Sequence, residues 1–380
     1  MTKQVFITKI SKFLPNSPVG NDEIEDHLGK IDGKASRARR IILRNNGIKT
    51  RHYVVDKEGN FSHNNAQLTA EAIRQLQSKD FDLKDIEVLA CGTSAPDQSL
   101  PSHTSMVHGE LGSAPIELFS PSGACCSGMH AMKYAYMSVL SEQSNNAVCC
   151  GSELISPMML AKNFEEETGK LNKLDQLPII AFDKDFLRWM LSDGAGAALL
   201  QSKPAKGLNL KIEWIEGTSY AHEFETCMYA ASTKEKDTSL KSWKFMNAQE
   251  WLDHSVFAMK QDVKLLGKNI TDLGAKFLKE ICYKRNFNVN DIDFFLPHLS
   301  SMFFWDKAVQ SMKDYDVCIP EEKWFTNLTR VGNVGSASIY LMLEELLRED
   351  KIKAGDRILL MVPESARFSY SYALLTAEEH

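Results

Sequence analysis

Apolar runs that look like strands alternate with amphipathic stretches along most of the chain. The segment LTAEAIRQLQSK (68–79) spaces its apolar residues as a helix does, and FDLKDIEVLACGTSAP (81–96) ends in a short apolar run typical of a buried strand. Strands that alternate with helices form mainly parallel sheets covered by helices. We therefore predict an α/β fold.

The same pattern occurs twice. The segment FNVNDIDFFLPHLSSM (287–302) repeats the order of aromatic, polar and aliphatic residues found at 81–96, and each copy follows a helical stretch. Because an internal repeat indicates a duplicated unit, we predict two α/β halves, 1–203 and 204–380. Residues 154–190 lack clean periodicity. They are interpreted either as an insertion that covers a substrate channel or as a surface excursion.

Composition narrows the class of protein. The 380 residues are 43% hydrophobic with a formal net charge of −6 and a mean hydropathy of −0.27, so neither nucleic-acid binding nor membrane insertion is expected. The first residues are interrupted by Lys3, Lys9 and Lys12, which does not fit a signal peptide. Eight cysteines, four of them in two adjacent pairs and none in paired CxxC motifs, indicate a reduced, cytoplasmic protein without a metal site.

Three residues stand at comparable places in the two halves. Cys126 lies at a strand-to-helix turn, His298 ends an apolar strand, and Asn333 lies at the matching turn of the second half. Because chemistry collects at the carboxyl ends of strands in α/β sheets, we expect the three to share one pocket. Taken singly, each is more often structural: a satisfied histidine, a turn asparagine, a core cysteine.

These residue types suit acyl transfer. A thiol at a helix N-terminus is expected to have a lowered pKa, and its thiolate can hold an acyl group as a thioester. A neutral histidine and an asparagine amide can both donate hydrogen bonds to an enolate or an oxyanion. The set therefore predicts acyl capture followed by carbon–carbon bond formation.

Six segments, in order, resemble the thiolase superfamily and within it the ketoacyl-ACP synthase III-like condensing enzymes. The resemblance covers nearly the whole chain and selects Cys126 over Cys125, because Cys126 directly precedes Ser127 and Gly128. The segments are NNGIKTRHYV (45–54), ACGTSAPDQSLPS (90–102), GACCSGM (123–129), SDGAGAALL (192–200), PHLSS (297–301) and GNVGSAS (332–338).

The resemblance implies a thiolase-like fold with αβαβα layers, Claisen condensation of acyl thioesters, and no cofactor. It also implies Cys126, His298 and Asn333 as catalytic residues, backbone N–H groups including that of Cys126 as the oxyanion site, acyl carrier protein or acyl-CoA as partners, and a homodimer. Lys260, Lys264 and Lys268, spaced as on one helix face, are either a docking site for an acidic carrier protein or a solvated face.

The chain departs from the family pattern at the C-terminal glycine-rich loop. Glu364, Arg367 and Phe368 occur there and are candidate substrate-binding residues. Glu364 and Arg367 either contact a polar substrate or form an ion pair at the surface. The segment RIILRN (40–45) also lacks the tryptophan that stacks on coenzyme A in housekeeping members. These departures resemble the ketosynthases that form dialkylresorcinol precursors (the DarB type).

Alternatives remain at this point. The chain could be a housekeeping ketoacyl-ACP synthase III that starts fatty-acid synthesis, or a thiolase-like partner subunit without catalytic activity. A Cys-His-Asn hydrolase of the papain kind is a third possibility, although the internal repeat argues against it.

Overall fold

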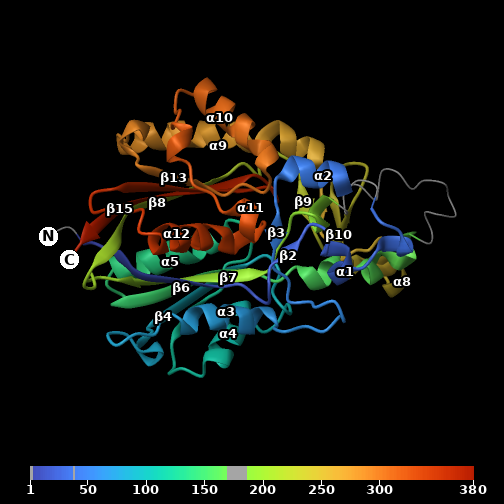
Figure 1. The fold of residues 1–380 in the computed structure, drawn as a ribbon, viewed down its shortest axis with the longest axis horizontal. Coiled ribbons are helices and arrows are strands. Elements are labelled where there is room, and N and C mark those ends of the chain that lie inside the picture. The colour runs from blue at the N-terminus through green and yellow to red at the C-terminus, as the bar shows by residue number, and fades with distance from the viewer. Residues whose placement is uncertain (1–2, 37–38, 169–185) are drawn as a thin grey trace.

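The computed structural model describes residues 3–36, 39–168 and 186–380. Figure 1 shows five layers: helices α9 and α10, a sheet layer, helices α5 and α12, a second sheet layer, and helices α3 and α4. The predicted α/β class and the αβαβα layering are therefore confirmed. No described helix has both the length and the apolar content needed to cross a membrane.

The strands of the first half form one side of a nine-stranded sheet in the order β5-β4-β6-β7-β1. Strands β4, β5 and β6 are parallel, whereas β7 is antiparallel to β6 and β1 is antiparallel to β7. Their bounds are β1 Phe6–Phe13, β4 Val88–Thr93, β5 Glu117–Phe119, β6 Asn146–Glu153 and β7 Gly194–Gln201.

The second half repeats this arrangement in the order β13-β14-β15-β8. Strand β14 is parallel to β13, β15 is antiparallel to β14, and β8 is antiparallel to β15. The strands β4, β6, β7 and β1 of the first half have the same sequence of directions. The topology thus shows the duplication, while the boundary at 203/204 stays a prediction. The bounds are β8 Leu208–Ser219, β13 Phe294–Pro297, β14 Arg357–Glu364 and β15 Ser369–Glu379.

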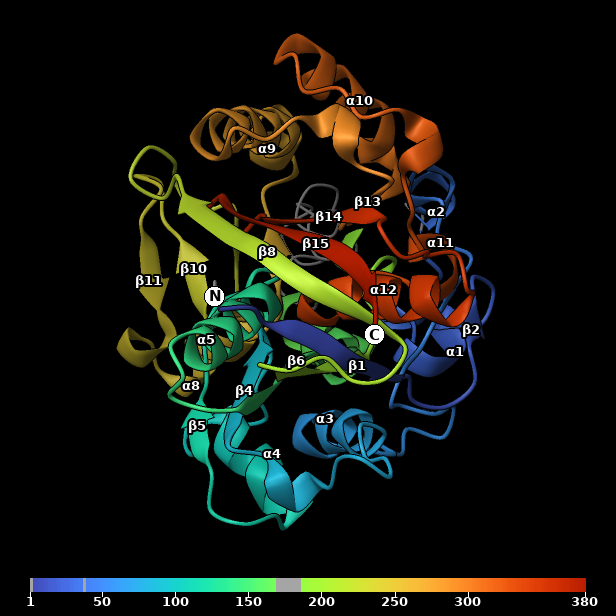
Figure 2. The same cartoon turned by 90° about the vertical axis from the view of Figure 1, so that its left-hand side faces the viewer.

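Strands β1 and β8 join the two sheet layers through only two residue pairs, Phe6 with Lys211 and Ile7 with Leu210. Figure 2 shows β8 and β15 above α12, and β1 and β6 below it. The two central helices therefore lie between the layers, where their residues are buried by both.

The central helices are α5 (Ser127–Leu140) and α12 (Ser338–Arg348). Both carry apolar residues on the faces turned to the sheets, because each is covered from two sides. The approach is close: a Cβ placed on Gly196 of β7 would lie 2.3 Å from the Cβ of Tyr340 on α12. Glycine at this position lets the helix lie directly on the strand.

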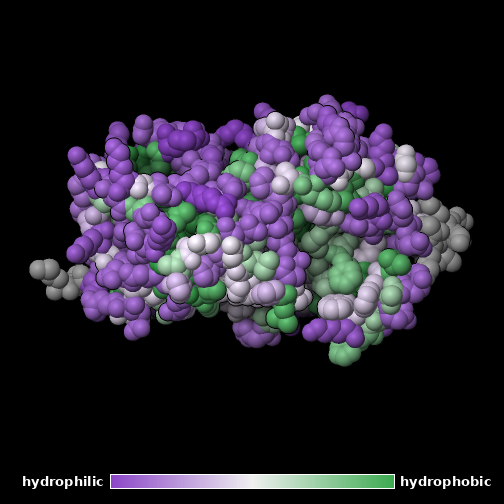
Figure 3. Space-filling view, turned by 90° about the horizontal axis from the view of Figure 1, so that it is seen from below, coloured by the Kyte–Doolittle hydropathy of each residue, from purple (hydrophilic) through white to green (hydrophobic). Residues whose placement is uncertain are grey.

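The outer helices are α3 (Asn65–Arg74) and α4 (His103–Leu111) on one side, and α9 (Val263–Arg285) and α10 (Trp305–Asp314) on the other. They have one buried and one solvated face, and Figure 3 shows hydrophilic residues over most of the surface seen from below. The remaining helices and strands are short: β2 Val19–Gly20, α1 Ile24–Leu28, α2 Arg39–Asn46, β3 Thr50–Arg51, β9 Met228–Tyr229, β10 Ser232–Lys234, β11 Leu240–Ser242, α8 Ala248–Asp253, β12 Lys260–Gln261 and α11 Leu328–Val331.

The predicted insertion at 154–190 lies partly outside the described residues, because 169–185 are not among them. Its described part holds two 3-10 turns, Ser156–Met159 and Ala161–Phe164, and contributes buried residues such as Trp189 to the core.

Candidate active site

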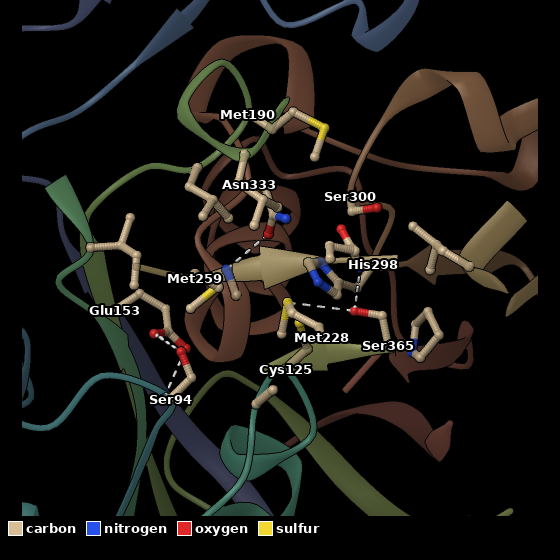
Figure 4. Close-up of a pocket in the computed structure, with 18 of the residues that line it drawn as sticks. Ser94, Cys125, Glu153, Met190, Met228, Met259, His298, Ser300, Asn333 and Ser365 are labelled. Carbon is tan, nitrogen blue, oxygen red and sulfur yellow. Dashed lines mark hydrogen bonds between the residues drawn. The ribbon is translucent and has the colours of Figure 1, made fainter. Parts of the chain in front are cut away.

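A cavity opens where the carboxyl ends of β6, β13 and β14 meet the loop before α12. The space between its lining atoms, open solvent included, amounts to about 650 Å³. Figure 4 shows that its walls come from both halves of the chain. The lining residues are Ser94, Ala124, Cys125, Glu153, Ile155, Leu187, Met190, Leu191, Ser192, Met228, Met259, Gln261, Leu266, Ile270, His298, Ser300, Asn333, Gly335, Pro363 and Ser365.

His298 and Asn333 both line this cavity, as the sequence predicts. His298 follows β13, and its backbone N–H donates to Met361 O at 2.8 Å, which anchors it to β14. Burial lowers the pKa of His298 to about 4, so the ring is neutral at pH 7. A neutral imidazole keeps one N–H that can be donated to a substrate oxygen.

Asn333 lies in the loop between α11 and the 3-10 turn Gly335–Ala337. Its side-chain Oδ1 accepts from the N–H of Gly335 at 3.0 Å, so the amide orientation is fixed within the loop. With the oxygen occupied, the amide nitrogen is the group left to donate to a ligand.

Of the two adjacent cysteines, Cys125 lines the cavity and Cys126 does not. Cys126 is fully buried, and its thiol donates to Val362 O at 3.2 Å on the core side of the turn. The Cys126 side chain is therefore not among those that line the cavity, because successive side chains at the start of α5 point in different directions, and its role as nucleophile stays a prediction. The backbone places Cys125 with His298 and Asn333 instead (Figure 4).

The thiol of Cys125 is not a ready thiolate. Burial raises its pKa above the usual value, and the carboxylates of Glu364 and Glu153 raise it further. The expected lowering of the thiol pKa by the helix N-terminus is therefore wrong for this site. This environment disfavours the thiolate of Cys125 at neutral pH.

Glu364, Arg367 and Phe368 do not line the cavity, in contrast to their prediction as substrate contacts. The Glu364 carboxylate Oε2 accepts from the backbone N–H of Ala124 at 2.9 Å and of Cys126 at 3.1 Å. The Cys126 N–H is therefore occupied, and the prediction that it holds the oxyanion is wrong.

The other two residues of this loop point away from the cavity. Arg367 is exposed, and its Nε donates to Phe224 O at 2.9 Å. Phe368 is fully buried with φ +56°, and its ring packs edge-on against Phe224 at 5.1 Å. Both side chains therefore hold the loop against residues 220–228.

Glu153 is a cavity residue that the sequence analysis missed. Its Oε1 accepts from the N–H of Ser336 at 3.1 Å and of Ser94 at 3.2 Å, and its Oε2 accepts from Ser94 Oγ at 2.6 Å. Burial raises its pKa to about 7, against the opposing effect of these hydrogen bonds. A glutamate that ends the apolar strand NNAVCC could have indicated it, since a charge there needs a partner.

Much of the remaining cavity wall is apolar. It includes the thioethers of Met190, Met228 and Met259, together with Leu266 and Ile270 of α9. Methionine side chains adapt to irregular apolar ligands, so this wall suits a flexible hydrocarbon chain. Leu187 and Met190, two described residues of the segment 154–190, line this wall, while the interpretation of the segment as a channel cover stays a prediction.

The three predicted docking lysines do not share a helix. Lys260 lies in β12, is buried, and its Nζ donates to Ser232 O at 3.2 Å, so its assignment to the helix face is wrong. The helix begins later, because Asp262 caps α9 by accepting from the N–H of Leu265 at 2.9 Å. Lys264 and Lys268 are exposed on α9, one helical turn apart.

Within the described residues, no group of three or more histidine, cysteine, aspartate or glutamate side chains could hold a metal ion. The polar groups at the cavity are thus a thiol, a neutral imidazole, the amides of Asn333 and Gln261, a carboxyl group and four serine hydroxyls. Such a set can form and break thioesters and can stabilise a developing negative charge on oxygen.

Comparisons with known sequences point to one family. The family described as "Beta-ketoacyl synthase, N-terminal domain" matches residues 59–205, and "3-Oxoacyl-[acyl-carrier-protein (ACP)] synthase III C terminal" matches residues 282–366. The beta-ketoacyl-[acyl-carrier-protein] synthase III of Clostridium novyi (strain NT) is 26% identical over 357 residues, which cover 94% of each chain. The corresponding synthase of Rickettsia prowazekii (strain Madrid E) is 26% identical over 364 residues, covering 96% of each.

Solved structures share the fold over almost the whole chain. The tetronic acid condensing enzyme AbyA1 superposes with a TM-score of 0.77 at 20% identity, covering 98% of this chain and 99% of that one. A variant of Xanthomonas campestris OleA gives a TM-score of 0.75 at 19% identity, covering 99% of each. The 3-oxoacyl-[acyl-carrier-protein] synthase III of Aquifex aeolicus gives a TM-score of 0.66 at 18% identity, covering 98% of this chain and 99% of that one.

Proposed function

Since this chain belongs to the ketoacyl-ACP synthase III-like condensing enzymes of the thiolase superfamily, we propose that it joins two acyl thioesters through an acyl group held on Cys125. One observation carries the proposal. The thiol of Cys125, the neutral ring of His298 and the amide of Asn333 meet at one cavity whose remaining wall is largely apolar. The overall chemistry is a Claisen condensation.

In the first step the Cys125 sulfur attacks the carbonyl carbon of an acyl thioester. The bond from that carbon to the donor's sulfur breaks, and the proton of the Cys125 thiol passes to the leaving sulfur. Because the raised pKa disfavours a free thiolate, proton loss and sulfur attack occur together. The Cys125 N–H has no hydrogen-bond acceptor in another described residue, so it can donate to the oxyanion.

In the second step a thioester of the malonyl type enters, and its free β-carboxylate is lost as carbon dioxide. The electron pair of the broken bond forms an enolate, which receives N–H hydrogen bonds from His298 and Asn333. The enolate carbon attacks the acyl carbon on Cys125, and the Cys125 sulfur leaves and regains a proton. Neutrality of His298 suits this role, since an acidic imidazolium would protonate the enolate.

We propose a specialised condensing enzyme of secondary lipid or polyketide synthesis, of the dialkylresorcinol type, over the housekeeping synthase. The sequence Pro363-Glu364-Ser365 stands beside the cavity where the family has a glycine-rich loop, and the methionine-lined wall can adapt to chains of different shape. The housekeeping reaction is the competing assignment. It predicts loading by acetyl-CoA in preference to longer chains.

For the partners, we propose that an acidic acyl carrier protein docks at Lys264 and Lys268, which are exposed on α9 next to the cavity-lining residues Leu266 and Ile270. We also propose a homodimer. Strand β5 is a free edge of the sheet in the described chain, and such an edge can pair with a second copy.

The test is intact-protein mass spectrometry after incubation with acetyl-, medium-chain and long-chain acyl thioesters on coenzyme A and on carrier protein. Wild type and Cys126→Ala are expected to gain one acyl group, whereas Cys125→Ala is expected to gain none. An adduct lost only in Cys126→Ala would restore the sequence-based choice of nucleophile. Absence of any adduct on the wild type would favour a non-catalytic partner subunit.

A second measurement separates condensation from hydrolysis. Acyl-loaded enzyme is mixed with a malonyl-type thioester, and the products are analysed by mass spectrometry. A product whose mass equals both chains minus carbon dioxide supports condensation. Release of free acid alone would indicate a thioester hydrolase.

A further inference from the structure

Two glutamates occupy equivalent places in the duplicated fold. Glu153 is the last residue of β6 in the first half, and Glu364 is the last residue of β14 in the second. Both strands have eight residues, both are the second strand of their parallel pair, and both glutamates are buried.

Each glutamate binds backbone N–H groups at the start of the other half's central helix. Glu364 accepts from Ala124 at 2.9 Å and Cys126 at 3.1 Å, directly before α5. Glu153 accepts from Ser336 at 3.1 Å, directly before α12. The contacts therefore run in both directions between the halves.

We propose that Glu153 and Glu364 are a reciprocal pair of positioning residues, each of which holds the reactive residue supplied by the opposite half. Glu364 fixes the peptide groups on both sides of Cys125, so that this thiol, and not that of Cys126, turns into the cavity. Glu153 fixes the turn that follows Asn333, whose own Oδ1 accepts from Gly335, the neighbour of Ser336. The inference deepens the proposed function and rests on it.

Glycine at position 335 lets the Glu153 carboxylate approach the backbone that it binds. A Cβ on Gly335 would lie 2.7 Å from Glu153 Cγ and Oε1, which is closer than real Cβ contacts. A Cβ on Gly123 would lie 3.5 Å from Glu364 Oε2, in van der Waals contact. The backbone on each side therefore comes close to the carboxylate that it binds.

The pair also sets the charge around the thiol. Burial is the main cause of the raised pKa of Cys125, and Glu364 and then Glu153 add to it. The other titratable groups nearby are the neutral His298, the Cys126 thiol and His130 of α5, whose pKa burial lowers. Removing either carboxylate charge should therefore lower the pKa of the Cys125 thiol.

The experiment uses the full chain with Gln and Ala variants at both positions and Glu379→Gln, at the exposed end of β15, as the matched control. Glutamine keeps an acceptor oxygen but removes the charge, whereas alanine removes both. Loading of Cys125 from octanoyl-CoA and condensation with a malonyl thioester are timed separately. Alkylation of Cys125 by iodoacetamide is followed against pH.

We expect Glu364→Ala to slow loading by roughly 10- to 100-fold, because small misplacement of a nucleophile has effects of that size, while Glu364→Gln stays within about 3-fold. Glu153→Ala should load normally and slow condensation by a similar factor of roughly 10 to 100. Both Gln variants should shift the alkylation profile to lower pH, with about 3-fold faster alkylation at pH 8 for each unit of pKa lost.

The proposal is overturned if Glu364→Ala loads at the wild-type rate, or if Gln and Ala variants lose both half-reactions equally without any shift in alkylation. Should the Ala variants fold poorly, Glu364→Asp and Glu153→Asp replace them. Each keeps the charge on a shorter side chain, so it should slow its own half-reaction and leave the alkylation profile in place. A wild type that alkylates at Cys125 but never accepts an acyl group refutes the proposed function instead.

Discussion

Asp193 lies directly before β7 and links this part of the chain to two other segments through hydrogen bonds to their backbone. Its side chain is fully buried. Oδ1 accepts from the N–H of Ile155 at 2.7 Å and of Ser156 at 2.9 Å, and Oδ2 accepts from the N–H of Val54 at 2.8 Å. We predict that Asp193→Asn destabilises the protein strongly although the side chains have the same shape.

The magnitude follows from the hydrogen bonds. In either orientation the asparagine NH₂ group faces at least one backbone N–H, and a buried donor left without an acceptor costs roughly 1–3 kcal/mol. The remaining bonds lose the contribution of the charge, about 0.5–1 kcal/mol each, while burying a neutral group offsets part of the loss. We expect a decrease of about 2–4 kcal/mol in the free energy of unfolding.

Urea denaturation followed by circular dichroism measures this decrease. The matched control is Asp56→Asn, because Asp56 also accepts backbone N–H groups, from Glu58 at 3.0 Å and Asn60 at 2.8 Å, but lies at the surface. Water can replace its bonds, so we expect a change below about 1 kcal/mol. Equal effects of the two substitutions would refute the reasoning that burial of the carboxylate determines the loss.

Three further predictions concern the site. Gly335→Ala should reduce condensation by roughly 10-fold or more in a product assay, because the new Cβ displaces Glu153 and φ is +47°; wild-type turnover would contradict this. The variant Glu153→Gln removes the carboxyl group whose pKa is about 7. In this variant the decarboxylation rate should stay constant on acidification to about pH 5, because the lowered pKa of His298 keeps its ring neutral there. A decline centred near pH 6.5 would count against a neutral imidazole. Reversing the charge of Lys264 and Lys268 to glutamate should slow loading from acyl carrier protein and spare loading from acyl-CoA, and an equal loss from both donors would remove α9 as the docking site.

The repeated pattern in the sequence was sufficient to place His298 and Asn333 at one cavity, although they come from different loops. Strand ends in a duplicated α/β unit converge, so the position of each residue in its own copy determined the outcome. The choice between Cys125 and Cys126 could not be made in this way. It depends on the direction of single side chains in a turn, which the hydrogen bonds of Glu364 to its backbone help to fix.

The assignment of Lys260 failed for a reason that the sequence contained. Residues spaced by four share a helix face only if all of them lie within the helix. Asp262 is the N-cap residue of α9, so the helix begins after Lys260. The roles of Arg367 and Phe368 were not predictable, because Phe368 has a positive φ that reverses the chain locally. Spacing alone does not indicate such a turn.

The protonated thiol and the methionine-lined wall have a consequence for oxidative damage. Peroxides react with thiolates far faster than with thiols, so Cys125 is protected by the same environment that raises its pKa. The thioethers of Met190, Met228 and Met259 have no such protection, because their oxidation needs no ionisation. Under oxidants the enzyme would first lose the apolar character of its channel through sulfoxide formation, and methionine sulfoxide reductases could restore it.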